Sequence, residues 1–479
     1  MESKGISSAG FHLSLFQKIA VVLMGGLLLG GMWRLRGDNG FGSFWGMLPC
    51  SVVFWLFLLS VFGYRKKMSY DVLPWAVLSI PFTINGWMPV MPLLRGFIEA
   101  PGGPGGAGVN ESFSYLSAIF LIFCLGFCWM TFLGFFLGLL FSPKRYRAWD
   151  FLLVAALYLA VMLAARGSLA HAVMRLAAPQ SWDAFARGLL EKGVTDSPFA
   201  FYLKNIFNDS AQKQFIGGRT YFNGVAVVGN ALGGLAVLAA LLVKYKDKTA
   251  ARVMASVCSV VGCSFLGAAL LNVMFSDGFR GAQYDARAAL PAWLMNNYWG
   301  FVEYGTGLFI GLGVTAFLVF QRKEFLNAHI EVAEDLPPSS KNKYWCYAYH
   351  MFVTAGFMLS ASTVRPIASR IRDGSGGAVS ETLVQIVVVA CLAPFFIPGL
   401  WRTIVKRELG QPFAPDLRRF AIVAAPLMLA VFSFIDLFIG WPFWNQPTVF
   451  PLQIQVGGSC ALVLLGYHLL VSLRVMRLD

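Results

Sequence analysis

Long stretches of apolar residues recur along this chain, and they constrain its fold more than any other feature. A helix needs about 20 mostly apolar residues to cross a hydrocarbon layer of about 30 Å, because its backbone N–H and C=O groups must find partners within the segment. The stretches that qualify are 17–33, 41–64, 70–93, 114–141, 148–166, 221–243, 252–275, 298–321, 344–364, 381–404, 419–441 and 451–473. The sequence therefore predicts an all-α, polytopic bundle of about 12 transmembrane helices that forms a single membrane domain over residues 1–479.

The composition agrees with a membrane environment. Hydrophobic residues make up 57% of the chain and charged residues 13%, whereas a soluble domain carries about 25% charged residues. The formal net charge is +14, but the basic residues lie in short clusters between apolar blocks and do not form a patch interleaved with aromatic residues. We therefore expect membrane lipids as partners and no nucleic acid.

The distribution of lysine and arginine predicts the orientation. Clusters such as Arg65-Lys66-Lys67, 144–147 and 244–252 follow every second apolar stretch. Because positively charged short loops stay in the cytoplasm, these clusters place both termini on the cytoplasmic side of a cell (cytoplasmic) membrane that the chain crosses many times. The stretch 70–93 is the weakest span, since it contains Pro74, Pro81, Pro89 and Pro92, and it is either interrupted or re-entrant.

The longest connection, 167–220, is expected on the outer side. Its segments 182–190 and 199–207 are short, aromatic and partly amphipathic, which is typical of helices that lie in the headgroup layer. A lid over an outer cavity is the alternative interpretation of this connection.

Few ionisable residues lie within the predicted spans, and those that do are candidate functional residues because a charge in a bilayer is costly. Glu303 and Asp436 both lie near outer span ends. Further candidates border the outer ends of spans and comprise Arg34, Arg36, Asp38, Arg219, Arg280, Asp285 and Arg287. Guanidinium groups bind phosphate and carboxylate through paired hydrogen bonds, so these residues are interpreted as a substrate-binding or coupling site. The alternative is that the arginines pair structurally with these acids or with lipid headgroups.

Several chemistries are excluded by the absence of their motifs. The sequence has no GxxxxGK[ST] phosphate loop, no HExxH and no Gly-x-Ser-x-Gly, and its eight cysteines include no CxxC pair. We therefore predict no metal and no cofactor, and no catalytic residue can be assigned.

Three functions remain open. The first is a transporter or flippase for a polar or anionic, including lipid-linked, substrate with an outward-facing polar pocket. The second is a membrane-embedded transferase that acts on lipid-linked or anionic substrates at the outer face, with Glu303 or Asp436 as the base. The third is a non-catalytic scaffold of an envelope complex.

Overall fold

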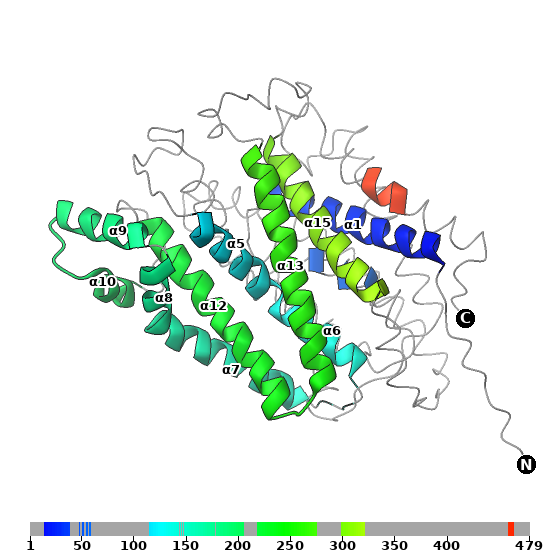
Figure 1. The fold of residues 1–479 in the computed structure, drawn as a ribbon, viewed down its shortest axis with the longest axis horizontal. Coiled ribbons are helices and arrows are strands. Elements are labelled where there is room, and N and C mark those ends of the chain that lie inside the picture. Colours follow the sequence, from blue (N-terminus) through cyan, green and yellow to red (C-terminus); the bar gives the residue numbers. More distant parts are fainter. Residues whose placement is uncertain are drawn as a thin grey trace, which may run out of the picture.

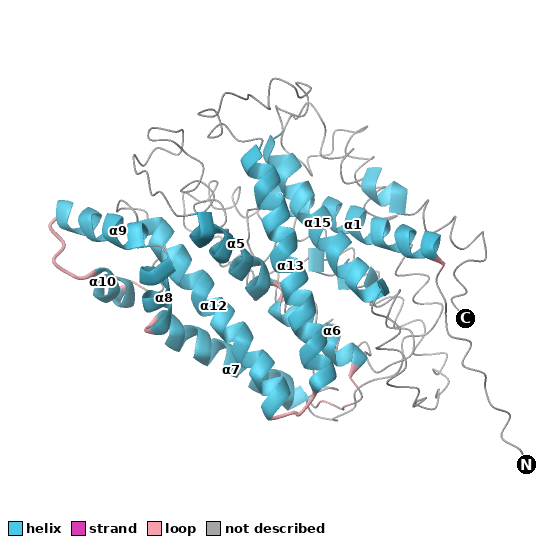
Figure 2. Cartoon of the chain, viewed as in Figure 1, coloured by secondary structure: helices cyan, strands magenta, loops and turns pink. Residues whose placement is uncertain are grey.

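The computed structural model describes residues 14–38, 115–142, 144, 146, 148–177, 179–205, 218–274, 298–320 and 458–463, together with 47, 50, 51, 54, 55, 57 and 58. Every regular element within these residues is a helix (Figures 1 and 2). They are α1 (Leu15–Asp38), α5 (Tyr115–Trp129), α6 (Thr131–Phe141), α7 (Ala148–Arg166), α8 (Leu169–Ala177), α9 (Pro179–Glu191), α10 (Pro198–Lys204), α12 (Gly218–Val243), α13 (Lys248–Met274) and α15 (Tyr298–Phe320). Residues 458–463 are also helical.

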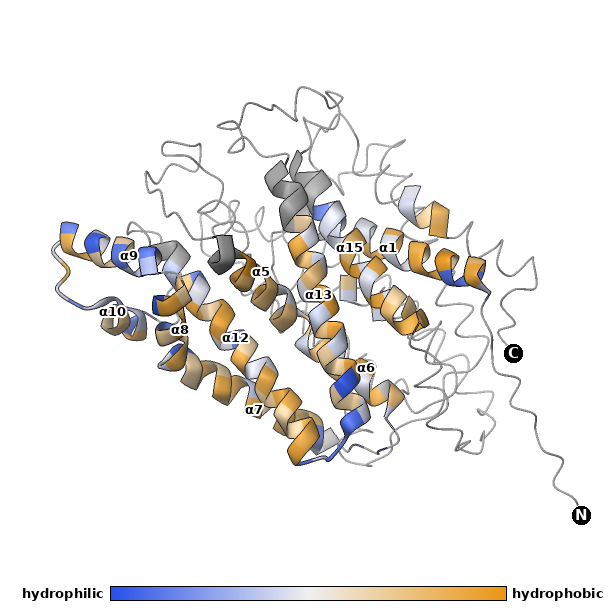
Figure 3. Cartoon of the chain, in the orientation of Figure 1, coloured by the Kyte–Doolittle hydropathy of each residue, from blue (hydrophilic) through white to orange (hydrophobic). Residues whose placement is uncertain are grey.

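In the described part of the chain, 5 helices are long and apolar enough to cross a membrane, or up to 6 if the bent pair α5–α6 is counted as one span. The apolar windows lie in α1, α7, α12, α13 and α15, and apolar residues dominate these helices in Figure 3. Hydrophilic residues gather instead on α9 and around the turn between α12 and α13 (Figure 3). The protein is therefore all-helical in its described part, as the apolar stretches predicted.

The other predicted spans lie wholly or partly outside the described residues. The stretches 70–93, 344–364, 381–404 and 419–441 lie outside the described residues, and only parts of 41–64 and 451–473 are described. The total of twelve spans and the placement of both termini in the cytoplasm stay predictions. Three helix ends differ from expectation by three or more residues, since α1 continues to Asp38, α12 begins at Gly218 and α13 begins at Lys248. A helix of 24 residues is about 36 Å long, so its polar end can extend into the headgroup layer.

The predicted span 114–141 is a broken helix. Its two halves meet at Met130 with a bend of 46°, and Met130 has φ −108° and ψ 20°, outside the helical range. No proline lies at this position. The bend instead accompanies close packing of both halves against α13.

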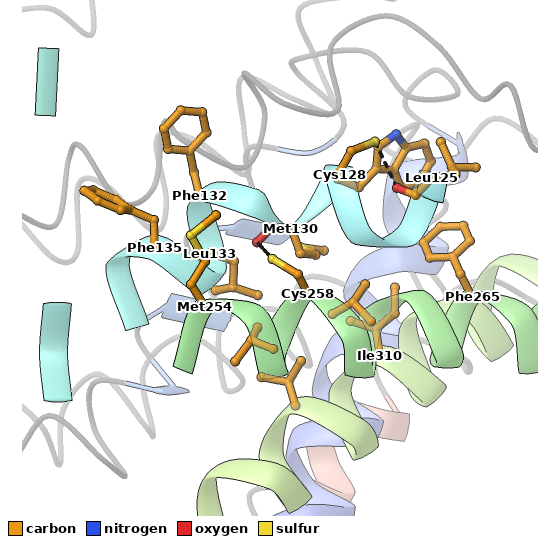
Figure 4. Packing of buried hydrophobic residues seen from close by; sticks show 14 of the residues in the cluster. Leu125, Cys128, Met130, Phe132, Leu133, Phe135, Met254, Cys258, Phe265 and Ile310 are labelled. Atoms are coloured by element: carbon orange, nitrogen blue, oxygen red, sulfur yellow. Dashed lines mark hydrogen bonds between the residues drawn. The ribbon is translucent and has the colours of Figure 1, made fainter. Parts of the chain in front are cut away.

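Glycines spaced by four or eight residues make this packing possible. Gly126, Gly134 and Gly138 face, in order, Gly262, Met254 and Ala250 of the antiparallel helix α13. A Cβ on Gly138 would lie 2.6 Å from the Ala250 carbonyl oxygen, so any larger residue there would force the helices apart. At the bend itself the Cys258 thiol donates to the Met130 carbonyl at 3.6 Å (Figure 4). The contact register is therefore kept through the bend.

Helices α1 and α15 form a second close antiparallel pair, and they lie side by side in Figure 1. A Cβ on Gly311 would lie 2.4 Å from the Gly25 carbonyl oxygen, and a Cβ on Gly307 would lie 2.4 Å from the Leu29 carbonyl oxygen. Glycine at these positions lets the two backbones touch, as small residues do in membrane bundles. An aromatic contact joins this pair to the rest of the core, because Trp33 lies 6.0 Å from Trp129 between ring centroids.

Helices α7 and α12 are the third antiparallel pair, and the short helices α8, α9 and α10 cover one end of it (Figure 1). Phe185 of α9 stacks on Tyr221 at a centroid distance of 5.3 Å, and Tyr202 of α10 lies 4.7 Å from Phe222. α9 and α10 therefore occupy parts of the connection 167–220 in which headgroup helices were expected. Their place relative to a membrane stays a prediction.

Candidate functional site

Two of the residues proposed from the sequence, Arg34 and Glu303, lie at the same end of the α1–α15 pair. Gly30 packs against Tyr304, and Gly307 packs against Trp33, so the antiparallel register brings the C-terminal part of α1 to the N-terminal part of α15. Arg34 is 5% exposed and Glu303 is 2% exposed. A basic and an acidic side chain are thus both buried at one end of two candidate membrane spans.

A third helical segment reaches the same end. The hydroxyl groups of Tyr304 and Ser459 share a hydrogen bond of 2.8 Å, which ties α15 to residues 458–463. Ser459 is itself buried. The end of the bundle that holds Arg34 and Glu303 is therefore built from segments more than 400 positions apart in the sequence.

The other proposed residues are placed less completely. Arg36 and Asp38 belong to the last turn of α1 and Arg219 to the first turn of α12, and nothing is described of their side chains. Arg280, Asp285, Arg287 and Asp436 lie outside the described residues. The structure thus places Arg34 and Glu303 at the same end of the α1–α15 pair, and the wider cluster stays a prediction.

A second polar group, which is partly buried and which the sequence did not single out as a site, lies where α7 meets α12. The Nη2 group of Arg166 donates a hydrogen bond of 2.7 Å to the Oδ1 atom of Asn230. The same guanidinium lies within electrostatic range of the Cys128 thiol and the Tyr158 hydroxyl. An arginine at the end of an apolar helix is thus directed into the bundle, toward α5.

His171 of α8 fixes the corner between α7 and α8. Its Nε2 lies 2.6 Å from the Arg166 carbonyl oxygen, and its Nδ1 contacts the Tyr221 hydroxyl. Because a carbonyl only accepts, we assign the ring proton to Nε2, and Nδ1 then accepts from Tyr221. Burial lowers the pKa of His171, while its hydrogen bond to the carbonyl opposes this effect. Burial therefore favours the neutral form of the imidazole.

Aromatic rings enclose His171. Phe199 and Tyr202 each lie 4.8 Å from it between centroids in edge-on orientation, and Tyr221 lies at 5.7 Å. The Arg175 guanidinium lies 5.4 Å from the Trp182 ring centroid, which adds a cation–π contact between α8 and α9. These contacts make α8, α9 and α10 a packed cap over one end of α12.

A third polar group lies at the opposite end of α7 and α12. The Tyr245 hydroxyl donates a hydrogen bond of 3.1 Å to Asp150 at the start of α7, and Lys144 donates to the Tyr245 carbonyl at 2.5 Å. Burial, followed by the nearby Asp150, raises the pKa of Tyr245. This group joins two connections that the charge distribution assigns to the cytoplasm, and its hydrogen bonds indicate a structural role.

The sequence missed Arg166 and Thr131 for different reasons. Arg166 was interpreted only as the boundary of the span 148–166, and its partner Asn230 is 64 positions away. Thr131 follows the bend, which has no local sequence signal. Asn230 was the available clue, because an amide inside an apolar stretch needs a hydrogen-bond partner.

The described residues contain no group of three His, Cys, Asp or Glu side chains arranged to hold a metal ion. Comparison with protein-family models found no matching family, and comparisons with curated proteins and with solved structures found no similar protein.

Proposed function

We propose that this chain is a transporter or flippase of the cell membrane that moves a polar or anionic substrate, lipid-linked substrates included, through an outward-facing polar pocket. The burial of Arg34 and Glu303 carries the proposal. A charged residue within a span costs about 2.5–3.5 kcal/mol on insertion scales, and such residues typically mark substrate or ion pathways. Arg34 would contact the substrate's negative charge, and Glu303 would balance that charge or carry a coupled proton.

Two features of the bundle support movement over a static role. The α5–α6 span is broken at Met130, and discontinuous helices form the binding sites of many transporters. The α1–α15 pair, which holds both charges, meets through glycine surfaces at Gly25 and Gly311. Glycine lets these two helices approach closely, and such a contact would serve the rocking of one part of a transporter against another.

Reconstitution of the purified chain tests the proposal. Liposomes of phosphatidylcholine and phosphatidylglycerol would carry either a fluorescently labelled phosphatidylglycerol or radioactive inorganic phosphate as the probe. We expect at least one probe to cross faster than in protein-free liposomes. Glu303→Gln should abolish this flux at normal expression, whereas Glu191→Gln, on the exposed end of α9, should leave it intact.

Each alternative function has its own result. Product formation in detergent, without a sealed compartment, would support a transferase in place of a transporter. Flux at the wild-type rate in Glu303→Gln would remove that residue from the mechanism, and absence of flux for every probe would contradict the proposal.

A further inference from the structure

Arg166 has a hydrogen-bond donor that no described residue uses. It ends α7 within the candidate span Trp149–Arg166, and one of its terminal nitrogens binds Asn230. Its Nε atom is buried and has no hydrogen-bond partner in the described part of the chain. A guanidinium carries five N–H donors in a planar fork that fits carboxylate and phosphate oxygens. The bond to Asn230 therefore orients the guanidinium group and leaves its Nε–H available to a ligand.

Thr131 supplies a second buried polar group. Its side chain is fully buried, and its Oγ1 atom has no hydrogen-bond partner within the described ranges. The hydroxyl faces α12 at Gly234, since a Cβ added there would lie 2.6 Å from Oγ1. Leaving a buried hydroxyl unsatisfied costs about 1–3 kcal/mol.

Helix α12 brings these two groups to one place. Asn230, which holds the Arg166 guanidinium, and Gly234, which faces Thr131, are four residues apart and hence on one face of the helix. Their separation along the helix axis is about 6 Å. The Arg166 guanidinium and the Thr131 hydroxyl therefore contact α12 within about one helical turn of each other.

The bend adds a third favourable element. Thr131 is the first residue of α6, a helix of 11 residues, and its N-cap residue Met130 forms no side-chain capping bond. The N-terminal end of a helix is the positive end of its dipole and favours anions. This end lies at the break between the two halves of the candidate span.

A purely structural role would account for only part of this arrangement. The Arg166–Asn230 bond ties α7 to α12, and Gly229 leaves room for the arginine stem, because a Cβ there would lie 2.5 Å from Arg166 Cγ. That bond does not need a free Nε–H or an unsatisfied hydroxyl on the same face. All three elements, by contrast, favour negative charge.

We infer that a phosphate or carboxylate group binds between Arg166 and Thr131 at the α5–α6 bend, with Asn230 orienting the guanidinium. The inference rests on the proposed function, since it assigns the position at which the substrate's negative charge is held. The oxyanion belongs either to a soluble substrate or to a lipid headgroup, and both sources share the same chemistry.

Binding to the full-length chain tests the site. The protein would be placed in nanodiscs of phosphatidylcholine, and its unfolding temperature would be measured against inorganic phosphate at constant ionic strength. We expect saturable stabilisation of the wild type. Arg166→Gln should remove it, and Thr131→Val should weaken the apparent affinity about tenfold, the effect of one buried hydrogen bond. Arg187→Gln, which alters an exposed arginine of α9, is the matched control and should bind as the wild type does.

A second set of nanodiscs distinguishes the source of the oxyanion. If a headgroup occupies the site, adding phosphatidylglycerol should stabilise the wild type but not Arg166→Gln, and phosphate should then add no further stability. If the substrate is soluble, phosphate should still stabilise the wild type in these nanodiscs. Both results support the site.

The inference is overturned if neither phosphate nor phosphatidylglycerol stabilises the wild type, or if Arg166→Gln and Thr131→Val retain full stabilisation. Thr131→Val keeps the side-chain shape, so it reports on the site even if Arg166→Gln fails to fold. Failure here is separable from failure of the proposed function. Arg166-dependent binding without flux would support the binding site and contradict the proposed transport. Flux that survives Arg166→Gln would support transport and contradict the binding site.

Discussion

The Tyr146 hydroxyl donates a hydrogen bond of 2.8 Å to the Asp247 carboxylate, joining the α6–α7 connection to the turn before α13. Ser142 donates to the same carboxylate oxygen, and the other oxygen accepts from the Ala250 backbone N–H at 2.9 Å. Asp247 is 2% exposed. Burial, with the hydrogen bond to Asp247 as the next contribution, raises the pKa of Tyr146 and keeps its hydroxyl protonated. Asp247 therefore caps α13 and holds two connections together.

We predict that Asp247→Ala lowers the free energy of unfolding by about 3 kcal/mol, because it removes a helix cap and leaves two buried hydroxyl donors without their acceptor. Denaturant unfolding in detergent would measure this change. Asp183→Ala, on the exposed face of α9, is the control and should change stability little. Equal stability of the two variants would contradict the assigned role.

The glycine contact between α1 and α15 gives a second prediction. Gly311→Ala should destabilise the protein by about 1–3 kcal/mol, the usual range for an overpacked core, because its Cβ would meet the Gly25 carbonyl oxygen. Gly305→Ala lies on the same helix and meets nothing within 4 Å, so it should be neutral or slightly stabilising. Thermal unfolding of both variants checks the pair, and wild-type stability of Gly311→Ala would mean that the two helices are not in close contact.

The lowered pKa of His171 predicts a dependence of stability on pH. Because burial lowers the pKa of His171 in the folded chain, the unfolded chain takes up this proton at the higher pH. The stability contribution of the neutral ring is therefore complete above about pH 6.5, the unfolded value, and falls as the pH drops toward the folded value. Unfolding temperatures across this range should show a smaller slope for His171→Gln than for the wild type. An identical slope would show that His171 is not the titrating group.

The arrangement of α7 and α12 predicts which connections share a side of the membrane. Lys246 lies in the turn after α12, whereas Glu191 lies on the cap at the other end of the same helix pair. Lys246→Cys and Glu191→Cys should therefore react with a membrane-impermeant maleimide from opposite sides, with Lys246→Cys protected in intact cells. Labelling of both from outside would contradict the predicted orientation, and the unsubstituted protein measures the background of native cysteines.

The sequence predicted those features that depend on composition over a whole segment. The limits of α7 and α12 follow from long runs of apolar residues, and the N-terminal limit of the apolar run at 221 differs from the helix start by three positions. The bend at Met130 could not be predicted, because it depends on how Gly126 and Gly134 approach α13. That contact joins residues more than 100 positions apart, so the sequence around Met130 does not indicate it.

Some residues of the candidate sites could likewise be selected from the sequence, and others could not. Glu303 could be selected from sequence because an acid near the end of an apolar stretch is unusual, and the structure shows it buried. Arg166 could not, since arginine commonly ends a span, and its significance depends on Asn230 and on the direction of its side chain. Thr131 is ordinary in sequence and becomes a candidate only through its burial.

The four-residue spacing along the bent span also limits how the chain length can vary. Positions 126, 130, 134 and 138 contact positions 262, 258, 254 and 250, in that order. The pairing of the bent span with α13 therefore keeps the same register on both sides of the bend. Each residue inserted into a helix turns everything beyond it by about 100°. A single insertion or deletion between Gly126 and Gly138 would therefore rotate bulky side chains onto α13, and the segment can change in residue identity far more readily than in length.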